Sequence, residues 1–281
     1  MQFRTASCVL AAALLVSACG SGGKDTPKTA APQRLDVTAR DFALSIQGAR
    51  TLRPGLVTIT ARNSGKQAHG MVLAKLNDGV DTRALVDALT LHPDRVSSLL
   101  TYVGGTTTLP KGSSWQATTS FDPGNYAMLD VGASAKGRLN FTRPGEVQGF
   151  SVTGKAVATP AERPTAKVSL YDYGIVMPKV IPSGGRIQVA NTGNDDHQLV
   201  FMPVASTAEA RRIVRALKTG HQTSTRYRPI EVLAPTSAAT SSTVSYRIPK
   251  GAYIAYCTYR TAASSGRVHA SLGMITAFAA K

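Results

Sequence analysis

The sequence predicts an all-β protein built from two tandem β-sandwiches, each with a short helical insertion. Val, Ile and Thr recur in short runs that Gly, Pro and Asn interrupt, which is typical of strands joined by turns. Of the 281 residues, 43% are hydrophobic and 6% aromatic, and a chain of this length forms roughly two domains with ordinary cores. The chain also repeats itself after about 128 residues, which indicates a duplicated domain.

Residues 1–18 are typical of an export signal. Arg4 precedes an apolar run, Cys8 to Val16, that is too short to span a membrane. The run leads into Val-Ser-Ala-Cys, which resembles the bacterial lipobox, so Cys19 is expected to be lipidated; an ordinary signal peptide is the alternative. Residues 19–33 form a flexible tether without apolar periodicity. We therefore expect an exported chain, lipid-anchored to the extracytoplasmic face of a bacterial membrane.

The two copies are predicted at residues 34–153 and 167–281, with a Pro-containing polar linker at 154–166. Each copy has an Asn-x-Gly turn between two strand-like runs, at Asn63 and at Asn191. A histidine follows each turn. His69 and His197 are therefore expected to occupy one structural position.

Each copy also contains one predicted helix. Apolar residues recur at helical spacing in DTRALVDALTL and STAEARRIVRALK, behind N-cap candidates at Asp81 and Ser206. The second helix carries four basic residues, which form either a solvated face or a docking surface: Arg211, Arg212, Arg215 and Lys218. Each copy closes with a strand pair containing Gly-x-Tyr, and Tyr126 and Tyr253 are expected in the core or at its corner.

Four potential metal ligands occur in the second copy. Cys257, His269 and Met274 lie on one C-terminal segment, and His197 precedes them by about 60 residues. Two imidazoles, a thiolate and a weak thioether together suit copper in both oxidation states. The other two cysteines fall in the signal and the lipobox, so Cys257 would be the only free thiol of the mature chain, without a disulfide partner.

With these residues, both copies resemble cupredoxins, the plastocyanin-like Greek-key sandwiches. The family pattern is an Asn-x-Gly turn leading to histidine, then a Gly-x-Tyr strand running into cysteine, histidine and Gly-Met. The resemblance implies one copper in the second copy, with a short bond to Cys257, equatorial His197 and His269, and a long axial bond to Met274. It also implies that the His269 edge lies near the surface. The eleven residues between Cys257 and His269 make a longer loop than blue-copper proteins usually carry.

The first copy departs from this pattern. Alignment places three residues without metal-binding sulfur or imidazole opposite the thiol, the second imidazole and the thioether: Asp130, Asn140 and Gly145. Only His69 survives. The first copy is therefore expected to lack a complete metal site and to have a structural or partner-facing role.

The histidines argue against copper-enzyme chemistry. Multicopper oxidases need His-x-His pairs, and the five histidines of this chain form none. The catalytic copper of a nitrite reductase would have only His69, His92 and His221, of which the last two are expected to be exposed. A hydrolase using Cys257 and His269 lacks an orienting third residue and an oxyanion motif. We expect an electron carrier or binding protein rather than an enzyme.

The charge is strongly positive, with 32 Lys and Arg against 16 Asp and Glu. Residues 24–150 carry 15 basic and 10 acidic residues, and residues 151–281 carry 16 and 6. Such a field favours an acidic redox protein or another anionic surface as partner, while no RNA-binding signature supports nucleic acid. We expect single-electron transfer through the second copy. Copper storage or handover, and a metal-free surface lipoprotein acting as a binding module, are the alternatives.

Overall fold

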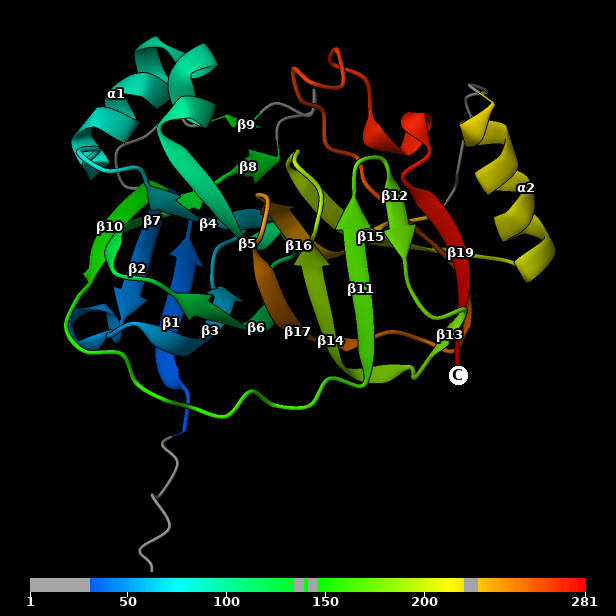
Figure 1. The fold of residues 1–281 in the computed structure, drawn as a ribbon, viewed down its shortest axis with the longest axis horizontal. Coiled ribbons are helices and arrows are strands. Elements are labelled where there is room, and N and C mark those ends of the chain that lie inside the picture. The colour runs from blue at the N-terminus through cyan, green and yellow to red at the C-terminus, as the bar shows by residue number, and fades with distance from the viewer. Residues whose placement is uncertain (1–30, 134–138, 141–145, 220–226) are drawn as a thin grey trace, which may run out of the picture.

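The computed structural model describes residues 31–133, 139–140, 146–219 and 227–281. The predicted signal peptide, Cys19, His221 and Gly145 lie outside them. In this part of the chain two large sheets run through both copies, and the copies lie side by side with α1 and α2 at opposite ends (Figure 1). The all-β prediction of two sandwiches, each with one helical insertion, is confirmed.

Four strands of the first copy and four of the second form one of these sheets. In spatial order they are β12 (Gly174–Val176), β11 (Ala166–Tyr171), β14 (Gly184–Asn191), β17 (Ser241–Arg247), β6 (Ser114–Phe121), β3 (Gly55–Asn63), β1 (Gln33–Arg40) and β2 (Ala43–Gln47). The copies meet where β17 pairs antiparallel with β6, from Ser242 opposite Thr119 to Ser245 opposite Gln116.

The facing sheet has nine strands within the described residues. In spatial order they are β10 (Val147–Val152), β7 (Gly124–Asp130), β4 (His69–Leu76), β5 (Leu100–Leu109), β16 (Ile230–Thr236), β15 (His197–Val204), β18 (Gly251–Tyr256), β19 (Ile275–Ala280) and β13 (Val180–Ile181). A separate small sheet joins β8 (Gly132–Ala133) to β9 (Leu139–Asn140). The copies meet again between β5 and β16, where Thr236 pairs with Val103.

The strand order of the large sheets places equivalent strands of the two copies symmetrically about the joint. Strands β6 and β17 are equivalent in sequence, as are β5 and β16, and each pair meets in the middle of its sheet. The same edge therefore contacts its own counterpart, as in a two-fold dimer. Residues 153–165 connect the copies along the lower edge in Figure 1, with one isolated bridge between Val157 and Gly55.

The helices begin where the sequence predicts. Helix α1 (Thr82–Leu91) is capped by Asp81, whose side chain accepts a hydrogen bond from the backbone N–H of Ala84. Helix α2 (Thr207–Lys218) is capped by Ser206 in the same way, through the N–H of Glu209. Among the described residues, none of the helices has both the length and the apolar character needed to cross a membrane.

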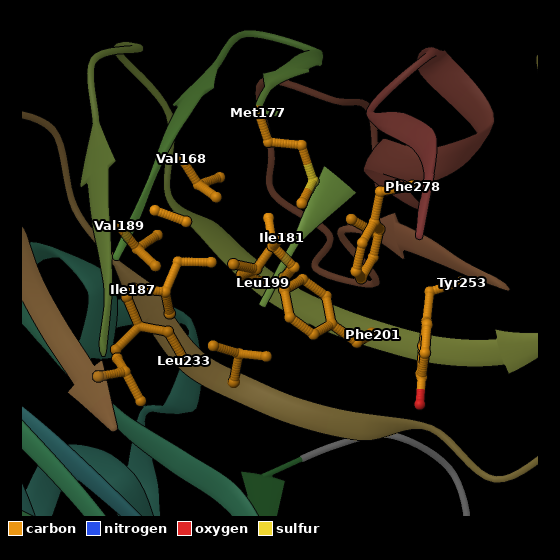
Figure 2. Close-up of a cluster of buried hydrophobic side chains, with 14 of the residues drawn as sticks. Val168, Met177, Ile181, Ile187, Val189, Leu199, Phe201, Leu233, Tyr253 and Phe278 are labelled. Carbon is orange, nitrogen blue, oxygen red and sulfur yellow. The ribbon is translucent and has the colours of Figure 1, made fainter. Parts of the chain in front are cut away.

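Each sandwich has its own core between the sheets. In the second copy, aliphatic side chains from both sheets pack against Phe201, Tyr253 and Phe278 (Figure 2). Tyr253 and its counterpart Tyr126 are buried, and their hydroxyls donate to the carbonyls of Pro249 and Asp122, four residues upstream in each case. Both tyrosines are thus core residues with one polar anchor, as predicted.

Candidate metal centre

The candidate site lies at one end of the second sandwich, where three neighbouring strands bring their ends together. His197 is the first residue of β15, Cys257 follows β18, and His269 opens a 3-10 turn, η4 (His269–Leu272), that leads into β19. Because β18 runs antiparallel to β15 and β19, these ends meet at the same edge of the sheet. This brings Cys257 and His269 next to His197, although they follow it by 60 and 72 residues in the sequence.

The two imidazoles and the thiol form a compact, fully buried cluster. One ligand atom each from His197, Cys257 and His269 lies within 4.8 Å of the others, and all three side chains are 0% exposed. The two Nδ1 atoms are 3.1 Å apart, and Cys257 Sγ lies 3.7 Å from His269 Nδ1. No other group of this kind was found among the described residues.

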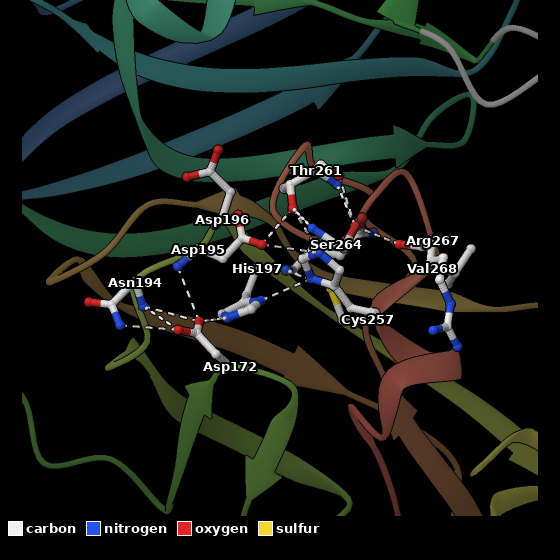
Figure 3. A network of polar contacts seen from close by, with 12 residues as sticks. Asp172, Asn194, Asp195, Asp196, His197, Cys257, Thr261, Ser264, Arg267 and Val268 are labelled. Atoms are coloured by element: carbon white, nitrogen blue, oxygen red, sulfur yellow. Dashed lines mark hydrogen bonds and ion pairs between the residues drawn. The ribbon is translucent and has the colours of Figure 1, made fainter. Parts of the chain in front are cut away.

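Hydrogen bonds fix the turn that carries His197. The amide of Asn191 donates to the carbonyls of Asp195 and Thr236 and accepts from the N–H of Gly193. The Asp172 carboxylate accepts from the backbone N–H groups of Asn194 and Asp195 (Figure 3). The imidazole is therefore held in place before any metal binds.

Asp172 also orients the imidazole itself. Its Oδ1 lies 3.0 Å from His197 Nε2. Burial raises the pKa of this carboxyl, but the N–H groups of Asn194 and Asp195, with His197, outweigh burial and lower it to about 2. Asp172 is thus an anion at neutral pH that accepts a hydrogen bond from Nε2, a common arrangement behind a metal-binding histidine.

His269 is held in a similar way by a chain of two acceptors. Its Nε2 lies 3.3 Å from Thr261 Oγ1 and 3.5 Å from Asp195 Oδ2, and the Thr261 hydroxyl donates to the same carboxylate oxygen. Burial, together with the nearby His197, lowers the pKa of His269. His269 is therefore a neutral imidazole with its proton on Nε2.

The groups behind the rings leave one nitrogen of each imidazole facing the other. Nε2 of His197 faces Asp172 and Nε2 of His269 faces Thr261, while the two Nδ1 atoms lie 3.1 Å apart, at hydrogen-bonding distance. A metal ion between the rings would replace this contact with bonds from two nitrogen donors. Two imidazole nitrogens and a sulfur, all buried and close to one another, therefore fit a bound metal ion.

The spacing of the donors also suits a small transition-metal ion. Bonds of about 2.0 Å to nitrogen and about 2.3 Å to sulfur at near-trigonal angles separate a nitrogen from a sulfur by roughly 3.7 Å. That is the distance from Cys257 Sγ to His269 Nδ1. The same geometry separates two nitrogens by roughly 3.5 Å, so the imidazoles need to part only slightly from their 3.1 Å.

The thiol is shielded from water and supported by the backbone. Burial raises the pKa of Cys257 to about 12, against the opposing effect of the N–H groups of Gln198 and Tyr259. The Gln198 N–H lies 3.3 Å from Sγ. Such a thiol is inert toward solvent oxidants, and a metal ion bound there must displace its proton.

Met274 lies beside the cluster, as its sequence position suggests. It is fully buried in the same core cluster as Cys257, and its carbonyl accepts the Cys257 N–H at 3.2 Å. Gly273 precedes it with a φ of 116°, in the left-handed region that favours glycine and turns the chain from η4 into β19. The role of Met274 as an axial ligand stays a prediction.

The expected surface edge of His269 is not found. The resemblance implied an imidazole edge near solvent, but His269 is 0% exposed. The reason is the long segment 258–268, which forms the orange loop at the top of Figure 1 and places Thr261 against Nε2. Tyr173 and Tyr259 cover the ring edge-on, with centroids 5.2 and 6.4 Å away.

The first copy repeats the scaffold of the site without its ligands. Asp41 accepts from the N–H groups of Lys66 and Gln67 and faces His69 Nε2, as Asp172 does for His197. Asp130 takes the place of the thiol, 2.5 Å from His69 Nδ1, and accepts the N–H of Gly70 at 3.2 Å. A carboxylate thus satisfies the nitrogen that would bind a metal, and the predicted equivalence of His69 and His197 is confirmed.

Some residues of the site were not predicted. Asp172, Thr261 and Tyr173 support or cover the imidazoles, yet the sequence gives them no ligand chemistry of their own. The repeated Asp followed by an aromatic, at Asp41 and Asp172, is the one signal that could have identified a shared role. Of the other histidines, His92 is exposed as predicted.

No protein-family model matches the chain, and no curated protein matches it. Among solved structures, auracyanin from Roseiflexus castenholzii is 12% identical over 41% of this chain and 94% of its own, with a TM-score of 0.26. A multicopper oxidase is 13% identical over 88% of both chains, with a TM-score of 0.26. A copper-containing nitrite reductase from Thermus scotoductus is 14% identical over 88% of this chain and 61% of its own, with a TM-score of 0.24. Similarity this low carries no argument about function, which rests on the donor geometry above. The strand order and the position of the site agree with the cupredoxin-like fold that the sequence predicts.

Proposed function

We propose that this chain is an exported, lipid-anchored copper protein that carries single electrons through the second copy. His197, Cys257 and His269 would hold the ion, with Met274 as a weak fourth donor. The observation that supports this most strongly is the pair of buried imidazoles whose Nδ1 atoms face each other beside a buried thiol. Soft sulfur and imidazole nitrogen together are the ligands that favour copper.

Such an ion would accept and release one electron. The protein's own contribution is to keep the donors in one arrangement for both oxidation states. Asp172 and Asn191 fix His197, and Thr261 fixes His269, so the geometry is set by bonds that do not involve the ion. Little rearrangement on electron transfer is the expected consequence.

We propose one copper per chain, because the two copies differ at the position of the thiol. In the first copy, Asp130 bonds to His69 Nδ1, the counterpart of the nitrogen that His197 would offer a metal in the second. Among the described residues, the one cluster of suitable ligands is that of His197, Cys257 and His269. We therefore propose that the first copy serves as a structural half of the joined sheets.

Electrons must enter and leave by a route other than the His269 edge, because that edge is covered. Tyr173 is the most direct candidate, since it is half-buried and its ring contacts the imidazole edge-on at a centroid distance of 5.2 Å. The other covering ring, Tyr259, leads inward to the buried Tyr102 at 6.3 Å. We assign the exit to Tyr173 and its surrounding surface.

The partner would be acidic. Helix α2 packs against η4, the turn that carries His269, and exposes four basic side chains, Arg211, Arg212, Arg215 and Lys218. Arg212 is partly neutralised by Glu209, 3.7 Å away. This basic face would steer an acidic redox protein or another anionic surface toward the exit; nucleic acid is not proposed.

The lipid anchor would be Cys19 on the extracytoplasmic face of a bacterial membrane. In that oxidising environment Cys257 would be the only free thiol, and among the described residues it is the free cysteine, buried and beside two imidazoles. Metal binding would give this free cysteine a function that does not require a disulfide partner.

Reversible redox chemistry tests the proposal. The chain from Gly20 onward, which contains every described residue, is loaded with Cu(II), reduced stepwise, reoxidised and desalted in both states. An electron carrier takes up one electron per chain and retains its copper throughout. Release of Cu(I) to a moderate chelator on reduction would instead identify a handover protein. Failure to bind copper at micromolar concentration contradicts both functions and leaves the metal-free binding module.

A further inference from the structure

A cavity of about 510 Å³ opens at the joint between the two copies, outside the metal centre. Strands β5 and β16 pair only at Val103 and Thr236 and then diverge, so the copies separate toward the other ends of these strands. The facing strands β6 and β17 stay paired as far as Gln116 and Ser245. The space between the diverging pair and the closed pair is the cavity.

One carboxylate bridges the gap at this divergence. Glu231 Oε2 accepts from the N–H groups of Thr107 and Thr108 at 2.5 and 2.9 Å, and from the Thr107 hydroxyl at 2.6 Å. These donors are backbone and hydroxyl groups of β5 that lack a strand partner there. Glu231 therefore joins the copies where the sheet itself cannot.

The second oxygen of this carboxylate is poorly satisfied. Glu231 Oε1 has one donor, Gln198 Nε2 at 3.4 Å, and within the described part of the chain Glu231 makes no ion pair. Burial raises the pKa of Glu231, and the bonds from Thr107 and Thr108 oppose the rise. A partly buried carboxylate with a weakly bonded oxygen beside a cavity favours a cationic donor.

Apart from Glu231 and the exposed Arg247, its one cationic residue, the lining is uncharged and suits an organic body. Trp115, Tyr246 and Tyr256 contribute aromatic rings, and Val200 and Ile230 contribute aliphatic surface. Aromatic faces attract ammonium groups as well as apolar groups. The volume lies within the range of small-molecule sites, roughly 300–1,000 Å³.

We propose that this cavity is a binding site for a small organic ammonium ion, with the ammonium on Glu231 Oε1 and the apolar body against Trp115. This function goes beyond the proposed electron transfer and does not depend on it. The cavity lies next to the metal centre, because Gln198 lines it and also donates its N–H to Cys257 Sγ. The cavity lining is therefore separated by one sequence position from His197, a proposed metal ligand.

The chain offers a built-in reporter for this site. Trp115 is the only tryptophan in the sequence, and it lines the cavity with its Nε1 bonded to the carbonyl of Val232. Its emission is followed in the metal-free chain from Gly20 onward. Three probes share one body and differ in charge: benzylammonium, benzyl alcohol and benzoate.

Benzylammonium is expected to change the emission saturably and to bind about tenfold or more tightly than benzyl alcohol, with benzoate weakest. Glu231→Gln removes that preference. Glu162→Gln, which removes the same charge from an exposed ion pair with Arg186, leaves it intact. Equal affinity for the three probes would mean that the cavity binds apolar groups without regard to charge. An equal effect of both substitutions would mean that the preference arises from the overall charge of the protein and not from Glu231. Either result overturns the proposal.

Because Glu231→Gln also weakens the joint, a second variant is needed. Val200→Phe adds a ring on the cavity wall beside Glu231, its cross-strand neighbour, and leaves the carboxylate and its charge in place. Folding of both variants is checked by circular dichroism. Loss of benzylammonium binding in Val200→Phe supports the site, whereas unchanged binding places the ligand elsewhere and contradicts it. The absence of any saturable change in the millimolar range contradicts it as well.

Discussion

Replacement of Asp172 by Asn tests whether the carboxylate behind His197 serves the metal. The substitution keeps the shape of the side chain but removes the charge that faces Nε2 at 3.0 Å. A hydrogen bond to a charged group is worth about 1.5–3 kcal/mol, and Asp172 is 31% exposed, so the lower end applies. A loss of about 1.5 kcal/mol corresponds to roughly tenfold weaker copper binding, at the low end of what is typical for a residue that orients a metal ligand.

The duplicated scaffold supplies the control. Asp41 anchors the equivalent turn through Lys66 and Gln67 and faces His69, which belongs to no cluster of metal ligands among the described residues. Asp41→Asn and Asp172→Asn are therefore expected to weaken their turns similarly, lowering the midpoint of urea unfolding in both variants. Only Asp172→Asn is expected to lower copper affinity in a competition titration with a chelator. Affinity within twofold of the parent, or an equal loss in Asp41→Asn, would refute the assigned role.

Three further predictions concern the rest of the site and its counterpart. Asp130→Asn leaves His69 Nδ1 without its anion and is expected to cost about 1.5–3 kcal/mol in urea unfolding with the copper spectrum unchanged; an altered spectrum would contradict a metal-free first copy. Thr261→Val removes the hydroxyl that holds His269 Nε2 and is expected to lower copper affinity about tenfold by competition titration, and an unchanged affinity would argue against the acceptor chain. Tyr173→Leu is expected to slow electron exchange severalfold in stopped-flow mixing with the visible spectrum preserved, whereas an unchanged rate would place the exit elsewhere.

The features that the sequence predicts well are local and repeated. The Asn-x-Gly turns need side-chain bonds to neighbours in the chain, and both copies form them alike, through Asn63 and Asn191. The N-caps at Asp81 and Ser206 depend on one turn of backbone. Strands β15, β18 and β19 are antiparallel neighbours, so the start of β15, the end of β18 and the start of β19 lie together. The residues at these positions could therefore be expected to meet.

The features that the sequence does not predict depend on contacts between distant segments. The cover over His269 results from how residues 258–268 pack against the turn at Asp195, which no local pattern specifies. The joint between the copies is equally hidden, because β6 and β17 have the same alternating pattern whether they form an edge or a paired strand. In the sequence, Glu231 is simply one acidic residue in a predicted strand. Its hydrogen bond from Thr107 of the other copy depends on the joint between the copies.

The thiolate-to-copper absorption band tests the central claim most directly. Cu(II) is added to the chain from Gly20 onward and to its Cys257→Ser variant, and the visible spectrum and copper content are recorded together. The site described above predicts one copper per chain and an intense charge-transfer band that the substitution abolishes. Copper bound without that band, or a band that persists in Cys257→Ser, would contradict a type-1-like site at His197, Cys257 and His269.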